Sequence, residues 1–356
     1  MSCAKPKILV AMSGGVDSAV AALRLQHDGF DVHGAFIWRG RFSDPAAGPA
    51  PADAAEMDSR DARLAAEALG IPFHVLNLED DFGALIDRFC RDYGAGRTPN
   101  PCVRCNPAIK FGRLLELADR IGAERLATGH YARIGNSGAR HLLLRARDAA
   151  KDQSYVLCML SQQQLARAVF PNGDFTKPET RRLASEAGLP AKDKPESQEI
   201  CFVPGNDYAR LIRAVSPGSL RPGPVLGLDG TTIGEHPGIQ LFTIGQRHGL
   251  RIAFGRPMYV VRLDAAANAV VVGPAEALLR RELTASGVNW IVEPPREPLR
   301  AAVKIRYRQA ALPATVRPLP DGRASVEFDE PARAVAPGQA AVFCLDDVVA
   351  GGGWID

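Results

Sequence analysis

Lys7-Ile-Leu-Val-Ala-Met-Ser13-Gly14-Gly15-Val16-Asp17-Ser18 is the stretch that decides the fold of this 356-residue chain. The apolar run after Lys7 fits a buried strand of a parallel sheet, and the apolar spacing after Ser18 fits a helix. Between them, two adjacent glycines let the backbone approach a ligand closely and adopt a positive φ. The following helix N-terminus offers unpaired N–H groups and a partial positive charge. The stretch therefore predicts a phosphate-binding loop.

The loop differs from the two common glycine-rich phosphate motifs, because it lacks the lysine of G-x-x-x-x-G-K-[ST] and the rhythm of G-x-G-x-x-G. Its S-G-G-x-D-S pattern resembles the PP-loop ATP pyrophosphatases, which transfer AMP to a substrate oxygen and release pyrophosphate. The resemblance implies an ATP site in which Asp17 helps to hold Mg²⁺, while Ser13 and Ser18 bond to phosphate oxygens. The alternative is an ordinary strand-to-helix turn with Ser or Asp as the helix cap.

Composition describes an ordinary globular chain. Its length suggests two or three domains, and 46% hydrophobic residues suffice for their cores. A net charge of +3 is too weak by itself to indicate nucleic-acid binding. The sequence contains no apolar run approaching the roughly 18 residues of a membrane span, and no signal peptide. We therefore expect a cytoplasmic protein that does not contact a membrane. Seven cysteines, an odd number, favour thiol chemistry or metal binding over a disulfide framework.

Strands and helices alternate through the first 130 residues. Beyond the opening stretch, strands are predicted over residues 30–37, 73–78 and 125–128, and helices over 82–93, over 109–121 and through Leu64 and Leu69 with Ser59 as cap. This alternation predicts an α/β fold with a Rossmann-like open parallel sheet and helices on both faces. Ligands of such sheets bind beyond the carboxyl ends of the strands, where the glycine loop would lie. Residues 40–58, rich in Ala, Pro, Gly and Asp, are predicted to form a mobile loop.

The rest of the chain changes character twice. Pro and Gly concentrate between Ser216 and Gly238, so a small central domain is expected over residues 205–280, after a catalytic ATP-binding domain over 1–204. Beyond a proline-rich linker at 293–298, short strands at 302–308, 324–328 and 340–345 predict a β-barrel over 285–356. In residues 303–308 basic and apolar side chains alternate, which gives one apolar and one basic face. The basic face is either a solvated surface or a phosphate-contacting strand.

A second set of motifs is more specific. T-P-N-P-x-x-x-C-N at residues 98–106 lies in a proline-dense segment, predicted to be extended, and A-T-G-H-Y-A occupies 127–132. K-D-Q-S-Y follows at 151–155, K-P-E-S-Q-E-I-C-F at 194–202 and G-E-H-P-G-I-Q-L-F-T-I-G-Q-R at 234–247. Together they resemble the tRNA-specific 2-thiouridylases over essentially the whole chain, from Ser13 to Gln339. The resemblance implies ATP-dependent 2-thiolation of the wobble uridine, position 34 of tRNA, with AMP and diphosphate as the other products.

The resemblance also assigns roles to two cysteines. Adenylation makes the uridine C2 oxygen a leaving group, Cys201 carries a persulfide received from a sulfur-carrier protein or cysteine desulfurase, and Cys105 is the partner nucleophile. Their reaction releases sulfur and leaves a Cys105–Cys201 disulfide that a reductant reopens. Because the thiolate is the reactive form, both cysteines are expected to be partly exposed near positive charge or a helix N-terminus. Arg104 is a candidate for that charge.

Cys102 departs from the pattern of those thiouridylases that carry an aspartate with an acid/base role at this position. Cys102, Cys105 and Cys201 could instead hold a [4Fe–4S] cluster with one iron open to sulfur. A zinc site is less favoured, because structural zinc normally has four protein ligands and no second C-x-x-C is present. The remaining cysteines are interpreted as small buried or incidental residues: Cys3, Cys90, Cys158 and Cys344.

The resemblance implies two sets of binding residues. The ATP site would comprise Ala11, Met12, Ser13, Gly14, Gly15, Val16, Asp17, Ser18, Ile37 and Gly129. The tRNA site, for the Lys, Glu and Gln acceptors, would comprise Arg97, Thr98, Pro99, Asn100, His130, Lys151, Asp152, Gln153, Arg306, Tyr307 and Gln339. Within it, residues 97–100 would line the flipped uridine. Ile37 stands where the similar proteins usually carry Met. As alternatives, His130 is a strand-end histidine satisfied by backbone, and residues 151–153 form an ordinary turn.

Two other functions remain open from the residues alone. Another PP-loop enzyme, such as an amide-forming synthetase or the lysidine-forming tRNA ligase, would need the same ATP site without paired cysteines. A non-enzymatic RNA-binding protein that holds zinc or a cluster would explain the basic strand and the C-x-x-C pair. Loss of product in Cys105 or Cys201 variants with adenylation intact would exclude the first, and pyrophosphate release with tRNA would exclude the second.

Overall fold

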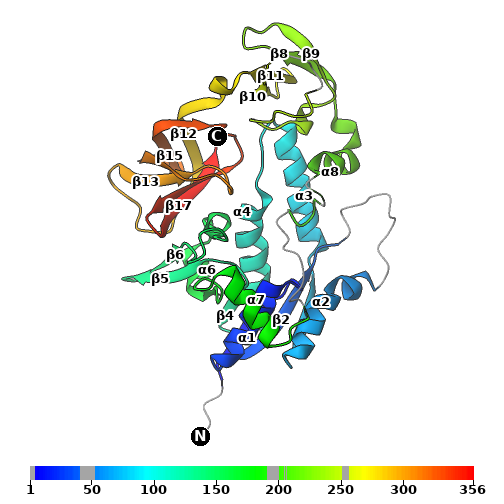
Figure 1. Cartoon of the computed structure of the whole chain (residues 1–356), viewed down its shortest axis with the longest axis vertical. Helices are drawn as coiled ribbons and strands as arrows, with labels where there is room; N and C mark the ends of the chain where they lie inside the picture. Colours follow the sequence, from blue (N-terminus) through cyan, green and yellow to red (C-terminus); the bar gives the residue numbers. More distant parts are fainter. Residues whose placement is uncertain (1–4, 41–52, 191–199, 204, 206, 251–255) are drawn as a thin grey trace.

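The computed structural model describes residues 5–40, 53–190, 200–203, 205, 207–250 and 256–356 (Figure 1). Its helices are α1 Val16–His27, α2 Ala54–Ala68, α3 Glu79–Gly94, α4 Pro101–Cys105, the π-helix η2 Asn106–Arg113, α5 Leu114–Arg120, α6 Gln162–Arg167, α7 Lys177–Glu186 and α8 Tyr208–Val215. Short 3-10 turns are η3 Ser154–Leu157, η5 Pro217–Ser219, η6 Ile239–Leu241, η7 Ala275–Leu278 and η8 Pro320–Gly322. None of the described helices is both long and apolar enough to cross a bilayer.

A five-stranded parallel sheet forms the centre of the first domain. Its strands, in spatial order, are β3 Phe73–Asn77, β2 Asp31–Trp38, β1 Lys7–Ala11, β4 Arg125–Thr128 and β7 Ala168–Val169. Strand β1 is buried on both faces: Ile8 and Val10 join a core with α1, α2 and α7, while Leu9 joins a second core with α4, η2 and α5. This confirms the predicted Rossmann-like sheet. Because β1 is central, the loop after it opens at the carboxyl edge of the sheet.

Helix α2 begins earlier than its sequence signals indicated. Asp53 occupies the cap position, and Ser59 lies buried within the helix, where its hydroxyl donates to the Glu56 carbonyl at 3.1 Å. The prediction of Ser59 as the cap is therefore wrong. Alanine-rich sequence favours helix, and Ala54 is itself buried against the core. Of the loop predicted over 40–58, residues 54–58 are helical, and 41–52 lie outside the described residues.

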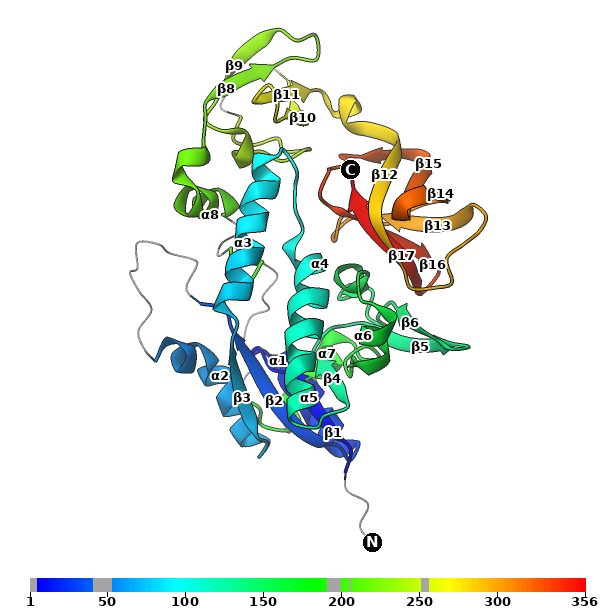
Figure 2. The same cartoon turned by 180° about the vertical axis from the view of Figure 1, so that it is seen from behind.

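The C-x-x-C pair lies on a helix, not on an extended segment as predicted. Helices α4, η2 and α5 form one continuous rod beside α3 (Figure 2). Pro101 suits the first turn of α4, where no N–H partner is needed. Pro107 has no N–H to donate to the carbonyl four residues earlier, and the rod continues there in the wider π register. Pro101, one of the prolines that suggested extended backbone, thus starts a helix, and Pro107 changes the register within it.

Two β domains complete the chain. The central domain is a four-stranded sheet, in the order β10 Tyr259–Asp264, β11 Ala269–Gly273, β8 Gly223–Leu226 and β9 Thr232–His236. The barrel contains β12 Leu279–Trp290, β15 Arg323–Arg333, β14 Leu312–Leu319, β13 Leu299–Lys304, β16 Ala340–Leu345 and β17 Val348–Ile355, and β12 pairs with β17. The first domain adds a hairpin to this sheet through β6 Arg140–Leu144 and β5 Arg133–Ser137, since β6 pairs with β17.

The basic strand of the barrel is shorter than predicted. Strand β13 ends at Lys304, and the chain then bends, with Gln309 N–H bonded to the Arg306 carbonyl at 3.2 Å. Arg306, expected on an outer basic face, donates through Nη2 to the carbonyls of Ile244 at 2.8 Å and Ala334 at 3.1 Å. Tyr307, expected on the apolar face, is 36% exposed. The alternating pattern of residues 303–308 therefore does not describe one strand.

Candidate active site

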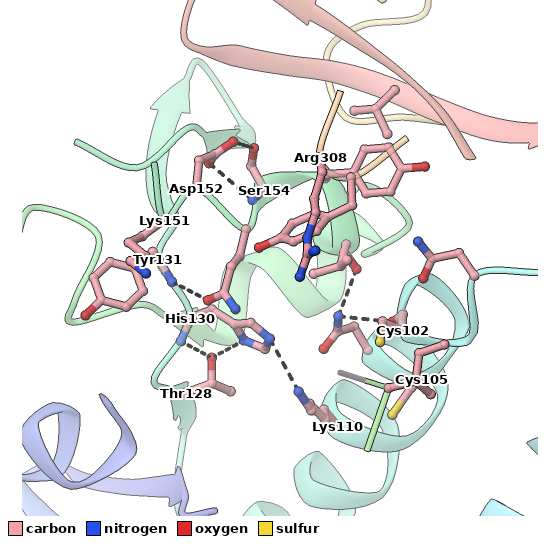
Figure 3. Close-up of a pocket in the computed structure, with 18 of the residues that line it drawn as sticks. Cys102, Cys105, Lys110, Thr128, His130, Tyr131, Lys151, Asp152, Ser154 and Arg308 are labelled. Atoms are coloured by element: carbon pink, nitrogen blue, oxygen red, sulfur yellow. Dashed lines mark hydrogen bonds between the residues drawn. The ribbon is translucent and has the colours of Figure 1, made fainter. Parts of the chain in front are cut away.

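One pocket is lined by residues from several of the sequence motifs. Its walls are the β1–α1 loop, the segment through α4, residues 128–131, residues 149–156, Cys201, and parts of the barrel. Figure 3 shows Cys102 and Cys105 on the helix at one side, opposite His130 and Tyr131. The predicted nucleotide loop and the predicted cysteines therefore face the same space.

The β1–α1 loop is shaped by its own hydrogen bonds and by close packing. Ser18 Oγ donates to the Gly15 carbonyl at 3.0 Å and accepts from Ser13 N at 3.2 Å. Gly14 has φ +74°, and a Cβ there would lie 2.9 Å from Asp61 Cβ. The backbone is therefore fixed in a turn that only glycine accommodates at this position, and α1 starts directly after it.

Gly129 is required where the end of β4 meets the same loop. A Cβ on Gly129 would lie 2.8 Å from both Asp17 C and Ser18 N. Asn172 ties the two segments together, donating through Nδ2 to the carbonyls of Asp17 at 2.8 Å and Gly129 at 3.3 Å. Ile37 lines the pocket from the end of β2. The residues predicted to surround the adenosine are thus in contact with the phosphate loop or share its pocket.

Asp17 is held by two residues that sequence reasoning missed. Lys177 Nζ lies 2.6 and 2.8 Å from its two carboxylate oxygens, and the Tyr131 hydroxyl donates to Oδ1 at 2.8 Å. The Lys177 ammonium and the Tyr131 hydroxyl therefore fix the orientation of the carboxylate, which lines the pocket. Tyr131 lies in a quoted motif, and Lys177 follows the Thr176 cap of α7. No local pattern pairs Lys177 with a residue 160 positions away.

The three cysteines line the pocket in different environments. Cys201 is exposed, and its carbonyl accepts from Arg39 Nη1 at 2.6 Å. Cys105 is buried against the apolar cluster of α3, and burial raises the pKa of its thiol to about 12, opposed by the charge of Lys110. Burial also raises the pKa of Cys102, again opposed by Lys110. The expectation of partly exposed thiols is met by Cys201 and is wrong for Cys105.

The cysteines described are all free thiols: Cys90, Cys102, Cys105, Cys158, Cys201 and Cys344. Across the described ranges, no three His, Cys, Asp or Glu side chains converge in a way that could hold a metal ion. The donor set that a cluster would need is therefore not assembled in this conformation.

His130 is buried and bonded by side chains, not by backbone. Nδ1 lies 2.7 Å from Thr128 Oγ1, and Nε2 lies 3.4 Å from Lys110 Nζ (Figure 3). Burial, followed by the nearby Lys110, lowers its pKa well below 6.5. The neutral ring accepts from the ammonium at Nε2, so the remaining proton is on Nδ1 and points to Thr128. Lys110, which sequence reasoning missed, is thereby directed into the pocket from the π-helix η2.

Most of the residues predicted to contact tRNA line the pocket, but Arg97 and Arg306 do not. Asp152 is 8% exposed and accepts from Ala146 N at 3.0 Å and from Ser154 Oγ at 2.9 Å. Gln153 Oε1 accepts from Tyr131 N at 2.9 Å. These contacts shape the turn at 151–153. The pocket is also lined by Thr98, Pro99, Asn100, Lys151, Tyr307 and Gln339.

The comparisons with known proteins cover the whole chain. Residues 6–205 match the family model described as tRNA methyl transferase HUP domain, 216–274 its PRC-barrel domain and 280–355 the aminomethyltransferase beta-barrel domain. The tRNA-specific 2-thiouridylase MnmA of Geobacter metallireducens is 49% identical over 99% of this chain and 97% of its own. The chain belongs to the tRNA-specific 2-thiouridylase family. The MnmA of Chloroflexus aurantiacus is 48% identical over 98% of both chains.

Membership of the 2-thiouridylase family, a family of tRNA sulfurtransferases, confirms the resemblance carried by the ordered motifs. The three matched domains confirm the predicted architecture of a PP-loop sheet, a small central domain and a carboxyl-terminal β-barrel.

Proposed function

We propose that this chain catalyses ATP-dependent 2-thiolation of uridine 34 in tRNA, acting in the cytoplasm. The observation that carries the proposal is the single pocket lined both by the PP-loop and by Cys102, Cys105 and Cys201. An ATP-activating loop alone would suit any PP-loop ligase. Thiols in the same space supply the nucleophile that a thiolation needs.

The nucleotide site fits ATP with Mg²⁺. The glycine turn before α1 presents the helix N-terminus to phosphate, and the Asp17 carboxylate, which lines the same pocket, is an oxygen ligand that would hold the cation. Bound ATP supplies the adenylyl group that turns the uridine C2 oxygen into a leaving group. Lys177, 5% exposed and paired with Asp17, places a positive charge beside the phosphates.

Sulfur transfer uses the two cysteines in sequence. Cys201, the exposed thiol, receives a sulfur atom from a sulfur carrier or cysteine desulfurase as a persulfide. The terminal sulfur attacks C2 of the adenylated uridine, and AMP leaves with the electron pair of the C–O bond. The Cys105 thiolate then attacks Cys201 Sγ, breaks the bond to the transferred sulfur and forms a disulfide. The freed electron pair completes the thiocarbonyl, and an external dithiol reductant reopens the disulfide.

The buried state of Cys105 requires that its proton be removed within the pocket. Lys110 favours the thiolate electrostatically, and Cys102 is the nearest additional thiol on α4. The cluster alternative would need Cys102, Cys105 and Cys201 to converge on iron, and they do not converge in the described structure. The proposed mechanism therefore uses no iron–sulfur cluster.

We assign the tRNAs that accept Lys, Glu and Gln as the substrates, because the resemblance to the family implies them. Residues 98–100 line one side of the pocket, where they would contact the flipped uridine, and Tyr307 and Lys304 line the barrel side. Lys304 Nζ is 5.6 Å from the Tyr307 ring centre, a cation–π distance that keeps a positive charge at this entrance.

The test is mass spectrometry of unmodified tRNA incubated with the protein, ATP, Mg²⁺ and a persulfide donor. We expect 2-thiouridine at position 34 and one AMP released for each sulfur added. Cys201→Ser and Cys105→Ser should abolish 2-thiouridine while retaining tRNA-dependent pyrophosphate release. Absence of 2-thiouridine with wild-type protein and all components present would refute the proposal.

A further inference from the structure

Barrel residues near the carboxyl terminus contact the segment that carries the cysteines. We propose that Gln339, Trp354 and Ile355 are positioning residues for sulfur transfer, because they hold residues 97–105, here called the cysteine segment, against the barrel. Its chemical consequence rests on the proposed function, but the contacts themselves exist without any substrate. They give the barrel a structural role in addition to the proposed contact with tRNA.

The first contact uses both backbone groups of Thr98. Its N–H donates to the Pro337 carbonyl at 2.7 Å, and its carbonyl accepts from Gln339 Nε2 at 2.8 Å. The approach is so close that a Cβ on Gly338 would lie 3.1 Å from Arg97 Cβ and 3.2 Å from the Thr98 backbone. Residues 337–339 therefore hold the Thr98 backbone through one backbone and one side-chain hydrogen bond.

The second contact comes from the end of the chain. Arg97 Nη2 donates to the Ile355 carbonyl at 2.8 Å, and that same carbonyl accepts from Gly338 N at 2.9 Å. Ile355 N in turn donates to the Gln339 carbonyl at 2.9 Å. The two barrel elements that touch the cysteine segment are thus bonded to each other and form one rigid support.

The third contact fixes the rotation of α4. The Arg104 guanidinium lies 3.9 Å from the centre of the Trp354 ring, and its Nε is buried without a hydrogen-bond partner among the described residues. Successive residues on a helix are roughly 100° apart, so Cys102 projects roughly 200° around the axis from Arg104. Holding Arg104 on the barrel therefore turns Cys102 to the opposite side, which is the pocket.

The far end of the segment is tied to the same region. Asn106 Nδ2 donates to the carbonyls of Cys102 at 3.1 Å and Val156 at 2.8 Å, and the neighbouring Tyr155 hydroxyl donates to the Ala340 carbonyl at 2.9 Å. Both ends of the cysteine segment are thus connected to residues 337–340 or 354–355. A movement of the barrel therefore displaces the thiols. The hydrogen bonds described above include none between the barrel and the β1–α1 loop.

The test is hydrogen–deuterium exchange of the full-length protein without tRNA, read on peptides covering 97–106. Trp354→Leu should speed exchange there roughly fivefold, the scale of losing a partly desolvated cation–π contact. Trp354→Phe keeps an aromatic face and should resemble wild type. Exchange of peptides covering β1 should not change. In single-turnover assays, Trp354→Leu should slow sulfur transfer while the tRNA dissociation constant stays within twofold.

Arg104→Met removes the same Arg104–Trp354 contact from the α4 side. It is the deciding variant if Trp354→Leu does not fold. The double variant should exchange no faster than either single variant, because both remove one interaction. Unchanged exchange at 97–106, equal effects of Leu and Phe, or acceleration that extends equally to β1 would each overturn the proposal. If wild-type protein makes no 2-thiouridine, the proposed function fails while the exchange result still judges the positioning contacts.

Discussion

Replacing Gly129 by alanine tests the assignment of the nucleotide site with a single methyl group. Gly129 needs no positive φ, so the substitution strains no backbone dihedral. The added Cβ would instead lie 2.8 Å from Asp17 C and Ser18 N, both backbone atoms that cannot rotate away. The β1–α1 loop must therefore shift by several tenths of an ångström.

Two measurable costs follow from that shift. Overpacking a tight site typically lowers the free energy of unfolding by about 1–3 kcal/mol. The displaced residues begin α1, whose N–H groups would contact the phosphates, and losing about 1.4 kcal/mol of those contacts weakens ATP binding roughly tenfold. Binding of tRNA should be little affected, because the methyl group points at the loop and not at the barrel.

Isothermal titration with ATP and urea unfolding measure the two effects. Gly94→Ala is the matched control, since a Cβ at the end of α3 meets nothing within 4 Å. Its free energy of unfolding should change by less than about 1 kcal/mol and its ATP affinity not at all. An ATP dissociation constant for Gly129→Ala within twofold of wild type would refute the assignment of this loop as the nucleotide site.

Three further substitutions probe titratable residues that line the pocket. Lys177→Met leaves Asp17, whose side chain is 33% exposed, without its cationic partner. Urea unfolding should show that the free energy of unfolding falls by about 1–2 kcal/mol, less than the loss of a fully buried pair would cost. ATP should also bind more weakly. Lys110→Met removes the charge that lowers the pKa of both α4 thiols, so their alkylation by iodoacetamide should need higher pH, whereas the arginine variant should resemble wild type. His130 has a folded pKa well below 6.5, so the unfolded chain binds its proton first and stability should fall as pH drops below 6.5, by up to about 1.4 kcal/mol per pH unit. His130→Asn should flatten that dependence in urea titrations at pH 5 to 7.

The parts of the fold that sequence predicted are those set by contacts between near neighbours. Strand β1, the glycine turn and α1 form one continuous stretch, so apolar spacing and two glycines were sufficient to place them. The prediction for the α4 segment was wrong because proline was interpreted as a sign of extended backbone. Pro101 lies at the start of a helix, where its missing N–H costs nothing. The prediction of Ser59 as the cap was also wrong, since a local cap preference was outweighed by burial of Ala54 and by the alanine-rich sequence.

The parts of the site that sequence missed depend on partners distant in the chain. Lys177 meets Asp17 across 160 positions, and the β6 hairpin joins the barrel sheet at Val348 and Val349. The burial of Cys105 comes from α3 side chains that no pattern around the cysteine specifies. The family resemblance predicts Cys105 and Cys201 as the reactive residues, but the raised pKa of Cys105 arises from packing that only the folded chain defines.

The two proposed steps, adenylation and sulfur transfer, depend on different parts of the fold. The loop proposed to bind ATP is held by β1, α1 and Gly129, all within the first domain. The thiols depend on contacts that join Arg97 to Ile355 across 258 positions and Thr98 to Gln339 across 241. Loss of a barrel contact such as Trp354 should therefore uncouple the steps, leaving pyrophosphate release near its normal rate while sulfur transfer slows. Equal slowing of both steps would mean that the barrel acts on adenylation as well, and that the pocket works as one rigid unit.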